Sequence, residues 1–142
     1  ALFSAKNTLN RWSWPSWPLS ILDEHYLLQA LDDKEHEAAT NDFLKQEKPK
    51  FIKALKECTL IENIQDSHAN FLLIQTKVSA QALVERLQQD NILIRDCESF
   101  GLGKQTCRIA IKSSIDNQTL VKALQQCTDL LSALPPANQG PA

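Results

Sequence analysis

The sequence predicts an α+β domain: a small, mostly antiparallel four-stranded sheet with helices on one face, preceded by a helical segment. The first part of the chain has apolar residues at helical spacing. The second part has short apolar runs bounded by turn residues, with a helical stretch between two pairs of such runs. We therefore expect a linker and helical segment over 1–58, an α+β domain over 59–134 and a flexible tail over 135–142.

Two helices are expected before the sheet. Ser20 can cap the first, and Asp23 and Glu24 suit the positive end of its dipole. The second is more polar and covers about 33–58, where Pro49 should kink or break it because proline lacks an amide hydrogen.

The strands are expected in two pairs, at 59–63 and 70–76, then at 91–97 and 106–113. Ser79 opens a helix between the pairs, and Ser114 caps a last helix that Pro135 and Pro136 end. Gly101 and Gly103 stand where the last two strands are connected.

Composition excludes several classes of function. The net charge is −2 and both signs are mixed along the chain, so we expect neither nucleic acid nor an anionic membrane surface as a partner. Apolar runs all fall short of the roughly 18 residues that a membrane span needs. The cysteines and the three histidines are scattered without ligand-like spacing, so a metal site is not expected. We expect a cytoplasmic protein with buried thiols at Cys58, Cys97, Cys107 and Cys127.

The absence of methionine leads us to expect a piece of a longer chain. Lys6, in Phe-Ser-Ala-Lys-Asn, faintly resembles the Ser-x-x-Lys arrangements of covalent enzymes, but the glycine-rich continuation is missing. We therefore interpret Lys6 as a solvated lysine.

Two arginines interrupt apolar strands. Strand periodicity predicts Arg108 and Ala110 on one face and Ile109 and Ile111 on the other. A guanidinium in this position suits the binding of a carboxylate or phosphate, because its fixed fork of donors matches their oxygens. Arg95 also stands within an apolar strand, so its guanidinium suits the same anions. The alternative is that each arginine pairs with a neighbouring acid such as Asp96, or lies along a sheet edge.

The segments 91–102 (Asn-Ile-Leu-Ile-Arg-Asp-Cys-Glu-Ser-Phe-Gly-Leu), 108–113 (Arg-Ile-Ala-Ile-Lys-Ser) and 116–124 resemble the end of fold-type-I enzymes that use pyridoxal phosphate (PLP), the aminotransferase class I/II family. Residues 69–73 (Ala-Asn-Phe-Leu-Leu) resemble the strand that opens the small domain's sheet. Residues 14–20 resemble the linker into the carboxy-terminal helices. Within the family, the resemblance is greatest to threonine-phosphate decarboxylases of cobalamin biosynthesis, and next to histidinol-phosphate aminotransferases.

This resemblance implies that Arg108 binds the substrate's α-carboxylate and that Arg95 helps to hold its phosphate. It also implies a phosphorylated amino acid as substrate, a homodimeric parent enzyme and PLP bound mainly by a missing upstream domain. The sequence departs from the family at Ser20, where asparagine is common, and before Gly101, where proline is usual. We expect this chain alone to be inactive. A stand-alone module that binds a small anion without catalysis is the alternative.

Overall fold

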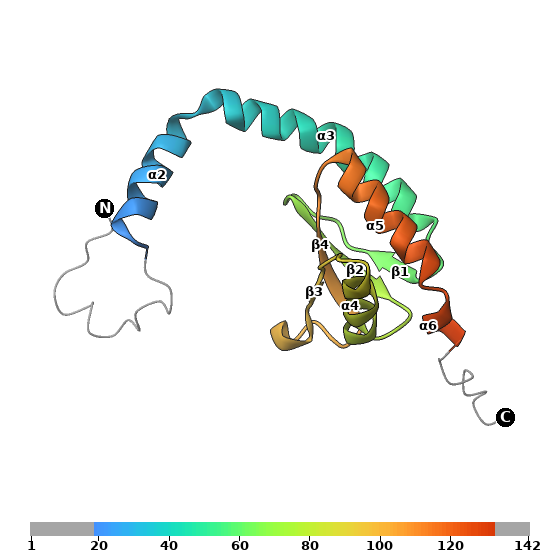
Figure 1. Ribbon diagram of the computed structural model, residues 1–142. Coiled ribbons are helices and arrows are strands. Elements are labelled where there is room, and N and C mark those ends of the chain that lie inside the picture. Colours follow the sequence, from blue (N-terminus) through green and yellow to red (C-terminus); the bar gives the residue numbers. More distant parts are fainter. Residues whose placement is uncertain (1–18, 133–142) are drawn as a thin grey trace, which may run out of the picture. The chain divides into compact units, whose positions relative to one another are not determined.

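A computed structural model describes residues 19–132 (Figure 1). The chain divides into two compact units, residues 1–39 and residues 40–142. In chain order the elements are α2 (Ile21–Asp32), α3 (Lys34–Lys56), β1 (Ile61–Ile64), β2 (Phe71–Thr76), α4 (Ala80–Gln89), β3 (Arg95–Asp96), the 3-10 helix η1 (Glu98–Phe100), β4 (Thr106–Ala110), α5 (Ser114–Gln126) and α6 (Asp129–Ser132). Across these described residues, every helix is too short or too polar to cross a membrane.

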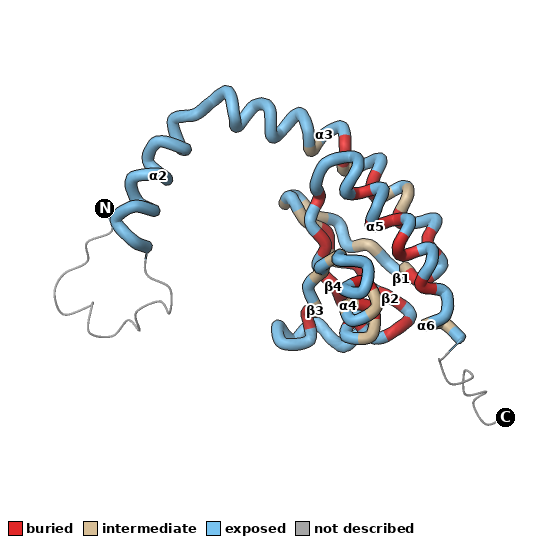
Figure 2. The backbone as a smooth tube through the Cα atoms, viewed as in Figure 1, coloured by how far each residue is buried: buried red, intermediate tan, exposed pale blue. Residues whose placement is uncertain are grey.

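The first unit is helical, and all its described residues are exposed (Figure 2). Ser20 caps α2 as predicted: its hydroxyl accepts from the Asp23 amide at 3.1 Å, and the Asp23 carboxylate accepts from the Ser20 amide at 3.1 Å. The exposed apolar side chains of this unit are Leu19, Ile21, Leu22, Tyr26, Leu27, Leu28 and Leu31. Local capping, rather than packing, therefore defines α2 within this unit.

The prediction was that Pro49 kinks or breaks this helix; the break is not seen, because α3 runs from Lys34 to Lys56 through Pro49. Pro49 is exposed, and water can therefore satisfy the carbonyl that its missing amide leaves free. Beyond Pro49 the helix contributes Phe51 and Leu55, which are both buried, to the core of the second unit.

The sheet has the strand order β1-β2-β4-β3, and each neighbouring pair is antiparallel. In the central pair Leu72 lies opposite Ile109, and Ile74 lies opposite Cys107. The predicted α+β class with a four-stranded antiparallel sheet is confirmed.

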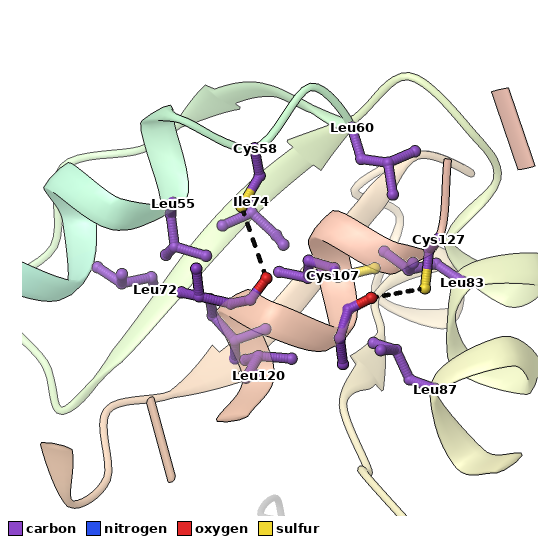
Figure 3. Packing of buried hydrophobic residues seen from close by; sticks show 14 of the residues in the cluster. Leu55, Cys58, Leu60, Leu72, Ile74, Leu83, Leu87, Cys107, Leu120 and Cys127 are labelled. Carbon is purple, nitrogen blue, oxygen red and sulfur yellow. Dashed lines mark hydrogen bonds between the residues drawn. The ribbon is translucent and has the colours of Figure 1, made fainter. Parts of the chain in front are cut away.

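One face of the sheet is covered by helices, and the core lies between them (Figure 3). Strands β2 and β4 supply Leu72, Ile74 and Ile109, each at most 1% exposed. Leucines from α3, α4 and α5 pack onto them in one cluster; among these are Leu55, Leu83, Leu87, Leu120 and Leu124. Burial of each such side chain contributes roughly 1.5–3 kcal/mol, so this face holds the domain together.

The third strand is shorter than the predicted 91–97. The Ile92 amide bonds to the Leu87 carbonyl at 3.0 Å, and Asn91 has a φ of 58°. Since this part of the chain closes the end of α4, pairing with β4 begins only at Arg95.

Two predicted helix ends also shift. Ser113, not Ser114, caps α5, and its hydroxyl accepts from the Asp116 amide at 3.2 Å. The Ser114 hydroxyl instead bonds to Glu47 on α3, a contact that sequence periodicity does not encode. Helix α5 ends at Gln126, before α6 and well before the prolines.

The four cysteines are buried free thiols, as predicted. Burial raises the pKa of Cys107 to about 12, with smaller contributions from Cys97 and Asp96. Between residues 19 and 132, histidines, cysteines and acids do not gather into any group of three that could hold a metal.

Candidate functional site

The candidate site is the uncovered face of the sheet. Ile109 faces the core at 1% exposure, whereas Arg108 and Ala110 on either side of it are exposed, as strand periodicity predicted. On β2 the same face carries Phe71 and Leu73, which are only partly buried. We call this surface the open face, and it is defined by Phe71, Leu73, Gln75, Arg95, Arg108 and Ala110.

The two predicted arginines are direct neighbours on the open face. Arg95 on β3 is the cross-strand partner of Arg108 on β4. Side chains in such a pair leave the sheet about 5 Å apart at their Cβ atoms. Like charges opposite one another destabilise a sheet, so this pair favours a role in binding over a role in folding.

Each guanidinium lies over an aromatic ring. The Arg108 Cζ is 5.3 Å from the centre of the Phe71 ring, and the Arg95 Cζ is 5.4 Å from that of Phe100. Both distances fall within the range of cation–π attraction. Phe71 belongs to β2, which pairs with one side of β4, whereas Phe100 lies in η1, in the connection from β3 to β4.

The alternative in which each arginine pairs with a neighbouring acid is not seen among residues 19–132. The ion pairs there involve other residues. Asp96, the expected partner, instead accepts from the Glu98 amide at 2.9 Å. Both guanidiniums therefore keep their donors available for an anion.

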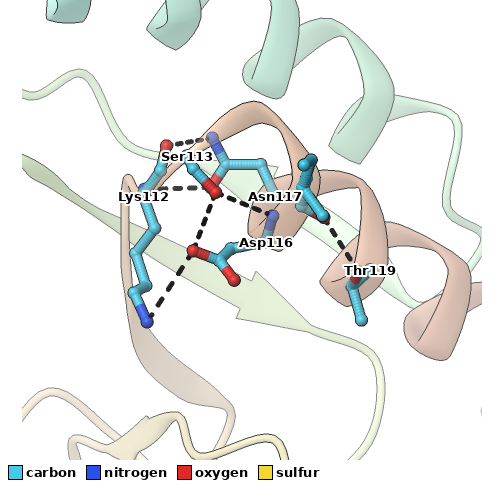
Figure 4. Close-up of polar contacts among 6 residues, drawn as sticks. Lys112, Ser113, Asp116, Asn117 and Thr119 are labelled. Atoms are coloured by element: carbon cyan, nitrogen blue, oxygen red, sulfur yellow. Dashed lines mark hydrogen bonds and ion pairs between the residues drawn. The ribbon is translucent and has the colours of Figure 1, made fainter.

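Strand β4, which carries Arg108, is fixed at both ends. At its start, the Thr106 hydroxyl donates to the Leu102 carbonyl at 2.7 Å. At its end, the Asn117 amide group accepts from the Lys112 backbone amide at 3.0 Å and donates to the Lys112 carbonyl at 2.8 Å (Figure 4). Asn117 thus joins the exit of β4 to the start of α5.

Glu47 extends this support to α3. Its buried carboxylate accepts from the Ser114 hydroxyl at 2.5 Å and from the Asn117 side chain at 3.1 Å. These two hydrogen bonds lower the pKa of Glu47, with a smaller contribution from Lys50, although burial acts in the opposite direction. The second half of α3 is therefore tied to the strand that presents Arg108.

The connection from β3 to β4 needs its glycines. Gly101 and Gly103 have φ values of 74° and 91°, in the left-handed region that favours glycine. Phe100, whose ring lies against Arg95, stands directly before this turn. The two glycines therefore lie in the connection between β3 and β4, as predicted.

A hollow of about 350 Å³ lies between α3 and α5, lined by Phe51, Ala54 and Val121 among others. Neither arginine lines it. The hollow lies between the helices that cover the sheet, so the site rests on the open face and not on this hollow.

Sequence reasoning found both arginines but missed the two phenylalanines. Phe71 shares the strand periodicity of the open face, which is the signal that identifies it. Phe100 gives no such signal, because it stands in a turn. Lys6 and the tryptophan-rich stretch 12–17 lie outside the described residues.

Fold and site together define a class: an α+β small domain that carries two exposed, neighbouring arginines on one face of its sheet. The chain matches the Aminotransferase class I and II family over residues 4–126, and it belongs to that family. The predicted resemblance to this family is thus confirmed.

Individual relatives agree. Threonine-phosphate decarboxylase from Salmonella typhimurium is 33% identical over 110 residues, which are 77% of this chain and 29% of that protein. The crystal structure of histidinol-phosphate aminotransferase from Clostridium acetobutylicum has a TM-score of 0.66 at 30% identity, covering 70% of this chain and 30% of that one. L-Threonine-O-3-phosphate decarboxylase from Porphyromonas gingivalis has a TM-score of 0.55 at 31% identity, with shares of 60% and 27%. The chain therefore spans less than a third of these proteins.

Members of this family use PLP, but the described residues do not form a binding site for it. Within residues 19–132 every buried side-chain nitrogen and oxygen has a partner, so no orphaned polar atom indicates a bound group. Lys48 is the least exposed lysine of that range, and its amino group donates to the carbonyls of Ser67 and Ala69. Residues 19–132 therefore offer no arrangement that fits the cofactor.

Proposed function

We propose that this chain is the carboxy-terminal portion of a PLP-dependent enzyme that acts on a phosphorylated amino acid, of the threonine-phosphate decarboxylase type. In this proposal Arg108 binds the substrate's α-carboxylate and Arg95 binds its phosphate. The observation that carries the proposal is the cross-strand pair of arginines, both exposed and without an acid partner among the described residues.

Physical chemistry supports this division of roles. A guanidinium binds a carboxylate or a phosphate through two parallel hydrogen bonds, and charge makes these bonds stronger than neutral ones. A ligand with an anionic group for each arginine removes the repulsion between the two guanidiniums. A ligand with a single anionic group leaves one of them uncompensated.

The substrate's reacting centre and the cofactor belong to residues outside 19–132 in this proposal. An anion anchor alone lowers no barrier, because it binds ground state and transition state equally well. We therefore predict that the 142-residue chain neither turns over O-phospho-L-threonine nor forms a single adduct with PLP. Borohydride trapping followed by mass spectrometry measures this, and one selectively modified lysine together with turnover would contradict it.

A histidinol-phosphate-type aminotransferase is the second candidate, and the TM-score of 0.66 to the Clostridium acetobutylicum enzyme favours it. The two reactions differ in their products. The full-length protein is to be assayed for CO₂ release from O-phospho-L-threonine and, separately, for 2-oxoglutarate-dependent transamination of histidinol phosphate. We expect CO₂ release; transamination without it would support the second candidate instead.

A stand-alone module that binds a small anion without catalysis is the third candidate. The genomic reading frame distinguishes it, because the enzyme needs an upstream segment with a Ser-x-x-Lys motif and glycine-rich phosphate-binding residues. For the enzyme we further propose a homodimer in the cytoplasm, which sedimentation and fractionation test.

A further inference from the structure

The two phenylalanines that lie against the arginines differ from the other large apolar residues of the second unit in what they contact. Phe71 is only partly buried and Phe100 is 59% exposed, so neither belongs to the core. Each ring instead lies against one guanidinium, at 5.3 Å for Arg108 and 5.4 Å for Arg95. The contacts of these two rings are therefore with the arginines and not with the core.

The two rings draw the guanidiniums in different directions. Arg108 stands opposite Leu73, and Phe71 stands opposite Ala110, so Arg108 reaches diagonally across to β2. Arg95 reaches to Phe100 in the turn after β3. Because β2 and β3 flank β4 on opposite sides, the two charges lie over separate rings instead of converging above their own backbones.

We propose that Phe71 and Phe100 are positioning residues that hold the two guanidiniums apart, and so set the spacing between the two anionic groups that the site accepts. The inference rests on the proposed function and deepens it, because it assigns selectivity for a doubly anionic amino acid to the aromatic rings. Without the rings, the arginines are free to converge on one anion. Selectivity for the doubly anionic ligand then falls.

Leucine variants of the full-length protein test this. Phe71→Leu and Phe100→Leu remove the ring and keep an apolar side chain of similar reach. We expect each to raise the KM for O-phospho-L-threonine roughly two- to fivefold, the size of one exposed cation–π contact. The kcat should fall less than the KM rises, and binding of unphosphorylated L-threonine should change less than twofold. Phe71→Tyr and Phe100→Tyr should restore the wild-type KM, since tyrosine keeps the aromatic face.

Phe43→Leu is the matched control, because Phe43 is 40% exposed on α3 and has no arginine over its ring among the described contacts. Phe43→Leu should leave the KM and the kcat for O-phospho-L-threonine unchanged. An unchanged KM in both leucine variants would overturn the inference. An equal loss of affinity for O-phospho-L-threonine and for L-threonine, which the tyrosine variants fail to restore, would also overturn it. That result indicates a merely structural role.

A second measurement separates this inference from the proposed function. If the wild-type protein turns over neither phosphorylated substrate, the proposed function fails, and inorganic phosphate serves as the probe. The side-chain NMR signals of the two arginines, assigned with Arg95→Lys and Arg108→Lys, should be shifted upfield by the rings and should titrate with phosphate separately. In the leucine variants they should lose that shift and titrate together. Signals without a ring shift in the wild type would overturn the inference.

Discussion

The two faces of the sheet are made by the same strands but differ in burial and in charge. On the covered face Leu72, Ile74 and Ile109 are at most 1% exposed and pack against three helices. On the open face Arg95 and Arg108 stand side by side in solvent. Each side chain buried on the covered face stabilises the folded domain. On the open face the two like charges of neighbouring arginines destabilise it.

This difference indicates how the domain divides its tasks. Like charges on cross-strand partners destabilise a sheet, and their repulsion is stronger where the dielectric is lower. Folding alone does not favour such a pair. The covered face therefore carries the stability, while the open face fits the proposed role in binding a ligand that brings negative charge.

The largest effect should come from the covered face. Leu72→Ala removes a fully buried side chain, so we expect the free energy of unfolding to fall by about 2–5 kcal/mol. Leu73→Ala, one residue away on the open face, should cost less than about 1.5 kcal/mol, because that side chain is only partly buried. Urea unfolding measures both, and equal losses would remove the distinction between the faces.

Arginine substitutions should show the opposite pattern. Arg108→Leu should weaken binding of a doubly anionic ligand to the full-length protein by about 10- to 100-fold, because charge-assisted hydrogen bonds contribute roughly 1.5–3 kcal/mol. Unfolding free energy should stay within about 0.5 kcal/mol or rise slightly. Arg86→Leu is the control, since Arg86 pairs with Asp90 at 2.8 Å on α4. A domain that unfolds on loss of Arg108 would show that the arginine is structural.

Glu47 should have an intermediate, pH-dependent effect. Glu47→Gln weakens the hydrogen bonds to Ser114 and Asn117, and we expect a loss of about 1–2 kcal/mol near neutral pH. Folding lowers the pKa of Glu47, so its contribution is present above the ordinary glutamate pKa, about 4.3. The contribution is lost as pH falls through the lower folded value.

Unfolding measured from pH 7 to pH 3 checks this sign. The gap between wild type and Glu47→Gln should shrink as the pH falls. Glu62→Gln, at an exposed position on β1, should show no gap at any pH. A gap that widens in acid would contradict the assigned direction of the pKa.

The smallest effect concerns the thiols. Burial raises the pKa of Cys107 to about 12, so at pH 8 very little thiolate is available. We expect slow alkylation of Cys107 by iodoacetamide in the folded chain and complete reaction in urea, measured by mass spectrometry. Ser99→Cys adds an exposed thiol in η1 as a positive control. Fast labelling of Cys107 without urea would mean that the covered face opens.

The comparison also shows which features of the chain could be predicted. The alternation of Arg108, Ile109, Ala110 and Ile111 follows from strand periodicity, and their exposure agrees with it. Ser20 and Ser79 were predicted to begin helices because a cap acts over three residues. The cap of α5 was predicted one residue late, since Ser113 and Ser114 are chemically alike and only the contact of Ser114 with Glu47 separates them.

By itself, the sequence determined the class of the fold, the face on which Arg108 lies and the family to which the chain belongs. These properties depend on neighbours within a few residues or on a pattern along the chain. The tertiary structure decided the rest: that Arg95 faces Arg108, that Phe71 and Phe100 lie beneath them, and that Glu47 meets Asn117 from 70 positions away. Strand register and helix packing bring these residues together, and both are set by the burial of the whole core rather than by any local pattern.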